Sequence, residues 1–127
     1  MSASIPPPPA VEGLKLSYPS PSILLITIHR EKQMNSLPTA LHWALDAILT
    51  WFDASPDLRV AVLTGAGNKA FCAGQDLIEL GKRDKGADIS HPDSGFAGIS
   101  RRIGKKPIVA AVNGFALGGG FEIVLNW

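Results

Sequence analysis

Hydrophobic residues follow two repeating patterns along the chain, one typical of strands and one typical of helices. Short runs rich in β-branched and aliphatic residues predict buried strands at residues 23–29, 59–64 and 107–112. Between the first two runs, five apolar residues recur at helical spacing: Leu41, Leu45, Ile48, Leu49 and Phe52. The chain is therefore predicted to alternate strands with amphipathic helices.

The first helix has clear start and stop signals. Asn35 or Ser36 can cap its N-terminus, and Pro38 suits the first turn, where a backbone N–H has no helical partner. Pro56 is expected to end the helix. Shorter helices are predicted further along, at residues 76–82, at 98–105 and from 121 onward, with a polar surface loop at 84–94.

The order of these elements favours an α/β fold, a mainly parallel sheet with helices on its faces. Ligands bind such sheets at the carboxyl ends of the strands. Two loops follow strands here, Gly65 to Asp76 and Asn113 to Gly120, and both are rich in glycine. We expect the functional site where these two loops lie.

Composition narrows the class of protein. Apolar residues make up 46% of the 127 residues and charged residues 18%, which is typical of one folded domain. We assign residues 1–12, which include Pro6–Pro9, to a flexible tail and residues 13–127 to the domain. A net charge of +1 argues against nucleic acid as a partner, and no apolar run approaches the length of a membrane span.

Several kinds of site are excluded or disfavoured by their motifs. No phosphate-binding glycine motif and no nucleophile elbow is present. The single cysteine, Cys72, excludes a disulfide framework and is expected to be a small buried hydrophobic residue. His29, His42 and His91 have no metal-ligand spacing and are predicted to be structural or solvated, so we predict no metal site.

The glycine loops have a chemical interpretation of their own. Gly118–Gly120 precede a predicted helix, so their backbone N–H groups are donors at the positive end of its dipole. The loop ending at Asp76 has the same character, and two such N–H groups could form an oxyanion hole. Glu122 lies one helical turn after Gly119, where a carboxylate could act as acid or base. On chemistry alone, an ordinary glycine-rich loop followed by an exposed glutamate is an equally good interpretation.

Three segments at these positions resemble a known family in order and spacing. They read HREKQMNSL at 29–37, VLTGAGNKAFCAGQDL at 62–77 and KPIVAAVNGFALGGGFE at 106–122. The sequence resembles the crotonase family, the enoyl-CoA hydratases and isomerases, from about Gly13 to Glu122. This resemblance implies the ClpP/crotonase fold, of which the chain would carry the N-terminal half, up to the active-site helix.

The resemblance also implies roles for individual residues. The backbone N–H groups of Gln75 and Gly119 would form the oxyanion hole, and Glu122 would be the acid–base residue. The substrate would be an acyl-CoA, with CoA bound as part of it and no separate cofactor. The residues expected to bind it are Lys32, Gln33, Ala73, Asp76, Leu77 and Ile78.

Other implications concern the rest of the family fold. A second catalytic carboxylate would lie beyond Trp127, as would the segments that family members use to form trimers or hexamers. Three functions therefore stay open: a hydratase, a double-bond or ring isomerase, and a catalytically inactive family member. Without its second half, the domain is expected to leave apolar faces under-covered around Leu41, Val60 and Ile108.

Cellular location and pathway are expectations only. The resemblance implies a mitochondrial, peroxisomal or cytoplasmic location. The region before Arg30 lacks the arginine-rich pattern of a mitochondrial transit peptide, so of these a peroxisomal or cytoplasmic location is expected. The pathway stays open between fatty-acid β-oxidation, aromatic degradation and secondary metabolism.

Overall fold

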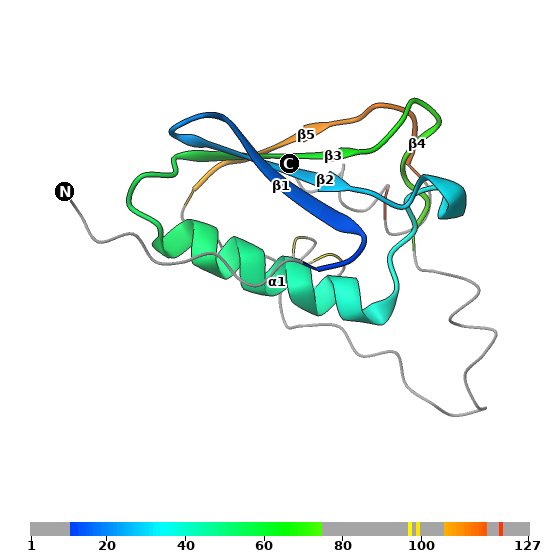
Figure 1. Ribbon diagram of the computed structural model, residues 1–127, viewed down its shortest axis with the longest axis horizontal. Coiled ribbons are helices and arrows are strands. Elements are labelled where there is room, and N and C mark those ends of the chain that lie inside the picture. The colour runs from blue at the N-terminus through cyan, green and yellow to red at the C-terminus, as the bar shows by residue number, and fades with distance from the viewer. Residues whose placement is uncertain (1–10, 75–96, 98, 100–105, 117–119, 121–127) are drawn as a thin grey trace.

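A four-stranded mixed sheet with one long helix beneath it forms most of the described fold (Figure 1). The computed structural model describes residues 11–74, 97, 99, 106–116 and 120. The strands lie in the order β1-β2-β3-β5. Their bounds are Leu14–Ser20 for β1, Ile23–Ile28 for β2, Val60–Gly65 for β3 and Ile108–Ala111 for β5. β2, β3 and β5 are parallel, whereas β1 pairs antiparallel with β2.

The core lies between one face of this sheet and helix α1, Thr39–Ala54. All five residues of the predicted helical face are buried, and Phe52 and Leu45 are completely inaccessible. Burial alternates along β2 and β3, so every second side chain faces the helix. The strands expected at 23–29 and 59–64 are therefore confirmed, but only one face of each is fully buried.

The strand expected at 107–112 exists as β5, but it is not buried as predicted. β5 is the last strand in the described sheet, and Val109 is 51% exposed. Val112 and Phe115, just after it, are 47% and 63% exposed. Leu41 is fully buried, so the expectation of an under-covered surface is wrong there, whereas Val60 and Ile108 are half-buried.

A second, two-stranded sheet was not predicted from the sequence. β4, Ala70–Cys72, pairs in parallel with β6, Phe115–Ala116. Both strands lie inside segments that the glycine content marked as loops. Strands of two or three residues are too short to show the alternation on which sequence patterns depend.

The start of α1 differs from the expected one, whereas its end at Ala54, two residues before Pro56, is as predicted. Pro38 is the N-cap residue and no side chain caps it, so neither Asn35 nor Ser36 has that role. At the other end, the Lys106 ammonium donates to the carbonyl oxygens of Phe52 (2.7 Å), Leu58 (2.6 Å) and Ser55. A cation at this position adds a charged donor to carbonyls at and just after the C-terminus of the helix.

Some expected elements lie outside the described residues: the tail at 1–10, most of the segment 76–105 and the helix from 121 onward. Within the part of the chain that is described, no helix has the length and apolar character to cross a membrane.

Candidate active site

The carboxyl ends of β4 and β6 lie side by side (Figure 1). Each strand lies inside one of the two glycine-rich loops. In the parallel pairing, Cys72 is the register partner of Ala116. Gln75 follows Cys72 by three residues, and Gly119 follows Ala116 by three residues. The pairing of β4 with β6 therefore brings the two glycine-rich loops together, as the sequence analysis expected.

The backbone around Gly120 lies directly against the end of β4. A β-carbon added at Gly120 would overlap the carbonyl group of Cys72. Only glycine allows two backbone segments to approach so closely. Gly120, at the end of the second loop, therefore lies against the end of β4 in the first loop.

A third segment, between β2 and α1, is joined to the loop after β4. The Ala73 N–H donates to the Met34 carbonyl (3.2 Å), and the Leu37 N–H donates to the Gly74 carbonyl (2.7 Å). Met34 comes directly after Lys32 and Gln33, which lie in the short 3-10 helix Glu31–Gln33. Three of the residues expected to bind substrate, Lys32, Gln33 and Ala73, are thus placed in one region.

Asn35 fixes this segment to the loop between β3 and β4. Its side chain is 1% exposed and its backbone is left-handed, with φ of 56°. The Nδ2 group donates to the carbonyls of Ala66 (3.0 Å) and Ala70 (2.8 Å), and Oδ1 accepts the Arg30 N–H (2.9 Å). A buried amide with both of its polar atoms bonded gives the segment a single defined position.

Two lysine side chains border an open pocket between the 3-10 helix and the loop that connects β3 with β4. The pocket has a volume of about 260 Å³ and is lined by Glu31, Lys32, Met34, Ala66, Asn68, Lys69 and Ala70. Lys32 and Lys69 are both exposed. They give the pocket two positive charges against the single negative charge of Glu31.

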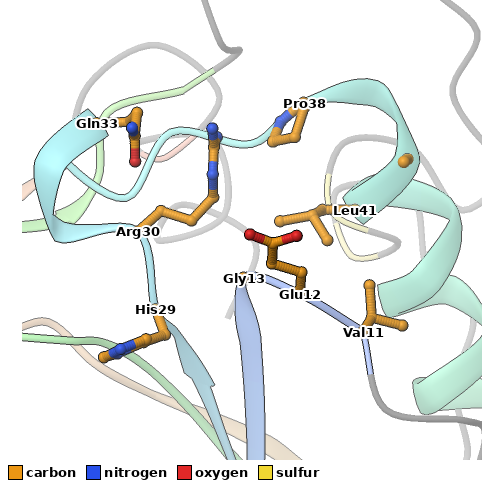
Figure 2. Close-up of a pocket in the computed structure, with 9 residues that line it drawn as sticks. Val11, Glu12, Gly13, His29, Arg30, Gln33, Pro38 and Leu41 are labelled. Atoms are coloured by element: carbon orange, nitrogen blue, oxygen red, sulfur yellow. The ribbon is translucent and has the colours of Figure 1, made fainter.

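A larger pocket of about 510 Å³ lies between the start of β1, the end of β2 and the start of α1 (Figure 2). Gln33 lines it together with Glu12, Arg30 and Leu41. The Arg30 guanidinium donates to the Ser36 carbonyl (2.6 Å), which ties this wall of the pocket to the segment before α1. Gln33 lines this larger pocket and Lys32 lines the smaller one. Both residues also line a third pocket of about 410 Å³.

The structure describes Cys72 and two of the three histidines, His29 and His42. Cys72 is buried, and burial raises the pKa of its thiol from 9.0 to about 11, while a hydrogen bond with the Gly74 backbone opposes part of that rise. The thiol is therefore neutral near pH 7 and a poor nucleophile, as predicted. His42 is buried and its Nδ1 accepts the Ala97 N–H (2.8 Å), whereas His29 is exposed. His91 lies outside the described residues.

Most residues predicted to carry chemistry also lie outside the described part: Gln75, Asp76, Leu77, Ile78, Gly119 and Glu122. Within the described residues, no cluster of three His, Cys, Asp or Glu side chains could hold a metal ion. Sequence reasoning did not single out Asn35, Lys69 or Asn113 as residues that shape the site. In the sequence, only their positions distinguish Asn35 and Asn113. Each is a polar residue next to a predicted helix or an apolar strand.

Comparison with known proteins agrees with the family resemblance found in the sequence. The sequence profile described as "Enoyl-CoA hydratase/isomerase" matches residues 19–126. The chain is 50% identical to a mevalonyl-coenzyme A hydratase of Beauveria bassiana and 46% identical to one of Aspergillus fumigatus. Each match covers 93% of this chain, but only 45% and 44% of the respective relative.

Solved structures agree with the sequence matches. A carnitinyl-CoA hydratase from Mycobacterium avium superposes with a TM-score of 0.80 at 36% identity. The match covers 92% of this chain and 44% of that one. The chain thus spans somewhat less than half the length of these relatives, and it has the crotonase fold over the part that it shares with them. The chain belongs to the enoyl-CoA hydratase/isomerase family.

Proposed function

We propose that this chain carries the acyl-CoA site of an enoyl-CoA hydratase, with an oxyanion hole made by the backbone N–H groups of Gln75 and Gly119. The observation that carries the proposal is the register of β4 and β6. Each proposed donor follows a paired residue, Cys72 or Ala116, by the same three residues. Two loops that start in register at one edge are well placed to direct one N–H each toward a common oxygen atom.

The proposed chemistry depends on the negative charge that develops on the thioester oxygen of the substrate. When water adds to the β-carbon of a 2-enoyl thioester, negative charge develops on the thioester oxygen. Two fixed N–H donors stabilise this charge, and the loss of one such donor costs about 10²–10³ in rate. Glu122, one helical turn after Gly119, would position the water and accept its proton.

The proposal places the nucleotide end of CoA at the lysine-bordered pocket. Lys32 and Lys69 carry positive charge there, and the phosphates of CoA carry negative charge. The backbone bonds of Met34 and Leu37 to the loop after β4 connect this region to the proposed oxyanion hole. A CoA thioester lying along that connection would reach from the lysines to Ala73.

The relatives favour a particular class of acyl group. The two fungal relatives are named mevalonyl-coenzyme A hydratases, and the superposed structure is a carnitinyl-CoA hydratase. Both names describe hydration chemistry on an acyl group that carries a further polar substituent. We therefore propose a short, hydroxyl-bearing acyl-CoA as the first substrate to test.

The test is dehydration of a short, hydroxyl-bearing acyl-CoA, and hydration of the matching 2-enoyl-CoA. Both are measured with the chain itself and with a chimera that continues it with the remainder of the Beauveria relative. Glu122→Gln is expected to reduce hydration by at least about a hundredfold, in the range typical of a lost general base. Asp57→Asn, a matched loss of one carboxylate at an exposed residue that lines none of these three pockets, is the control. Retention of most activity in Glu122→Gln contradicts the assigned role. Incorporation of ¹⁸O from solvent distinguishes hydration from the alternative, isomerisation of a double bond.

A second candidate is a family member that binds CoA without turnover. The exposed apolar side chains of Val109, Val112 and Phe115 favour it, since a complete active site normally has its walls covered. Turnover by the isolated chain would exclude this candidate. CoA binding without turnover, restored to activity only in the chimera, would support it for the chain alone.

A further inference from the structure

The loop between β3 and β4, residues 66–69, forms one wall of the lysine-bordered pocket. Ala66, Asn68 and Lys69 of this loop line the pocket, as does Ala70 at the start of β4. Asn68 and Lys69 are exposed. An exposed loop keeps one position only where other groups bond its backbone. The place of the Lys69 ammonium group therefore depends on what holds the backbone of the loop.

Asn113, between β5 and β6, bonds to this loop on both sides of Lys69. Its Nδ2 donates to the carbonyls of Gly67 (2.8 Å) and Ala70 (3.3 Å), and its Oδ1 accepts the Gly65 N–H (3.1 Å). The side chain is half-buried. One amide thus joins the residue before the loop, its middle and the residue after it.

The two residues after Asn113 lie against Lys69 itself. The Phe115 N–H donates to the Lys69 carbonyl (3.0 Å). A β-carbon added at Gly114 would overlap the same carbonyl group, so the two backbones are in close contact there. Three consecutive residues, 113–115, therefore support the backbone that carries Lys69.

We propose that Asn113 is a positioning residue for phosphate binding, because it fixes the loop that carries Lys69. This inference rests on the proposed function, which places the nucleotide end of CoA at the lysine-bordered pocket. The second lysine of the pocket, Lys32, lies in the 3-10 helix, a segment separate from the loop that Asn113 bonds. A loop already held in place presents its lysine without further ordering when the phosphate binds, which favours affinity.

The charge of Lys69 provides a readout that a loss of stability would not change. A contact between a lysine and a phosphate weakens as salt screens it, so the Kd of a nucleotide rises with NaCl concentration. Asn113 carries no charge. If its loss moves Lys69 away from the phosphate, the salt dependence of binding falls although no charge has been removed. A loss of stability elsewhere leaves that dependence as it was.

The experiment measures the Kd of adenosine 3′,5′-bisphosphate, a nucleotide like the one at the end of CoA, by calorimetry at several NaCl concentrations. Lys69→Met is expected to raise the Kd about tenfold at low salt, as for the loss of one charge-assisted bond. Asn113→Ala is expected to raise it at least about threefold, within the range for members of one hydrogen-bond network. Its salt dependence is expected to fall toward that of Lys69→Met.

Double variants show through which lysine Asn113 acts. Asn113→Ala is expected to change nothing further when combined with Lys69→Met, and to keep its full effect when combined with Lys32→Met. Ser55→Ala is the uncharged control, because it removes a bond to the Trp51 carbonyl (2.7 Å) at the C-terminal end of α1. It is expected to leave the Kd and its salt dependence unchanged. Asn113→Ser, whose hydroxyl can donate only once, serves as the second variant if Asn113→Ala does not fold.

Two results overturn the inference and leave the proposed function intact. One is an effect of Asn113→Ala that is equal in the two lysine backgrounds, and the other is a salt dependence that stays at the wild-type value. A Kd that neither Lys32→Met nor Lys69→Met changes contradicts the proposed place of the CoA nucleotide, and the inference fails with it.

Discussion

Substitution of Asn35 by alanine tests whether this buried amide holds the site region together. The change removes three hydrogen bonds, to the Ala66 and Ala70 carbonyls and from the Arg30 N–H. At about 1 kcal/mol for each bond, the loss is about 3 kcal/mol. The left-handed backbone at φ of 56° adds about 1 kcal/mol for a residue with a β-carbon and no compensating side-chain bond. We expect the free energy of unfolding to fall by about 4 kcal/mol.

Urea denaturation followed by tryptophan fluorescence measures this loss. With a slope of about 2 kcal/mol per molar urea, the midpoint is expected to fall by about 2 M. Asn68→Ala is the matched control, because Asn68 lies in the loop to which Asn35 bonds but is exposed, and a change of less than about 0.5 kcal/mol is expected there. If the two variants lose the same stability, the bonds drawn at Asn35 do not contribute as reasoned.

Three further predictions use other parts of the fold. Lys106→Met should lower the free energy of unfolding by about 2 kcal/mol in urea titrations, because it leaves the carbonyls at the end of α1 without their charged donor; no loss would contradict this. With the pKa of Cys72 raised from 9.0 to about 11, its thiolate fraction at pH 8 is about a hundredfold lower, so iodoacetamide should label the folded chain at least that much more slowly than the urea-unfolded chain. Equal rates would show an accessible thiol. Gly114→Ala should separate β6 from β4 and speed hydrogen exchange of the Phe115 N–H at least about tenfold, whereas unchanged protection would show that the strands tolerate a β-carbon there.

The main sheet and helix were predictable because their signals are long and periodic. The helical face from Leu41 to Phe52 and the strands β2 and β3 each bury one side against the other, so the hydrophobic pattern records their packing directly. β1 was missed as a strand, since Pro19 and exposed polar residues interrupt its pattern. The prediction that β5 is buried was wrong, because an apolar sequence alone does not show whether another element covers the strand.

The candidate site, like the fold, could be predicted from the sequence only in part. From the sequence come the residue types, the glycines of both loops, Glu122 and the single cysteine, because these are local chemical properties. The resemblance to a family also came from the sequence, and the matches to known proteins confirm it.

Only the tertiary structure decided which segments meet. The parallel pairing of β4 with β6 joins residues more than forty positions apart, and neither strand is long enough to have a pattern of its own. Asn35 resembled a helix cap in the sequence, yet the fold uses its side chain to bond the loop between β3 and β4. The physical reason is that a short polar side chain bonds whichever backbone groups the packed elements leave without partners, and those groups are defined only after the elements have packed.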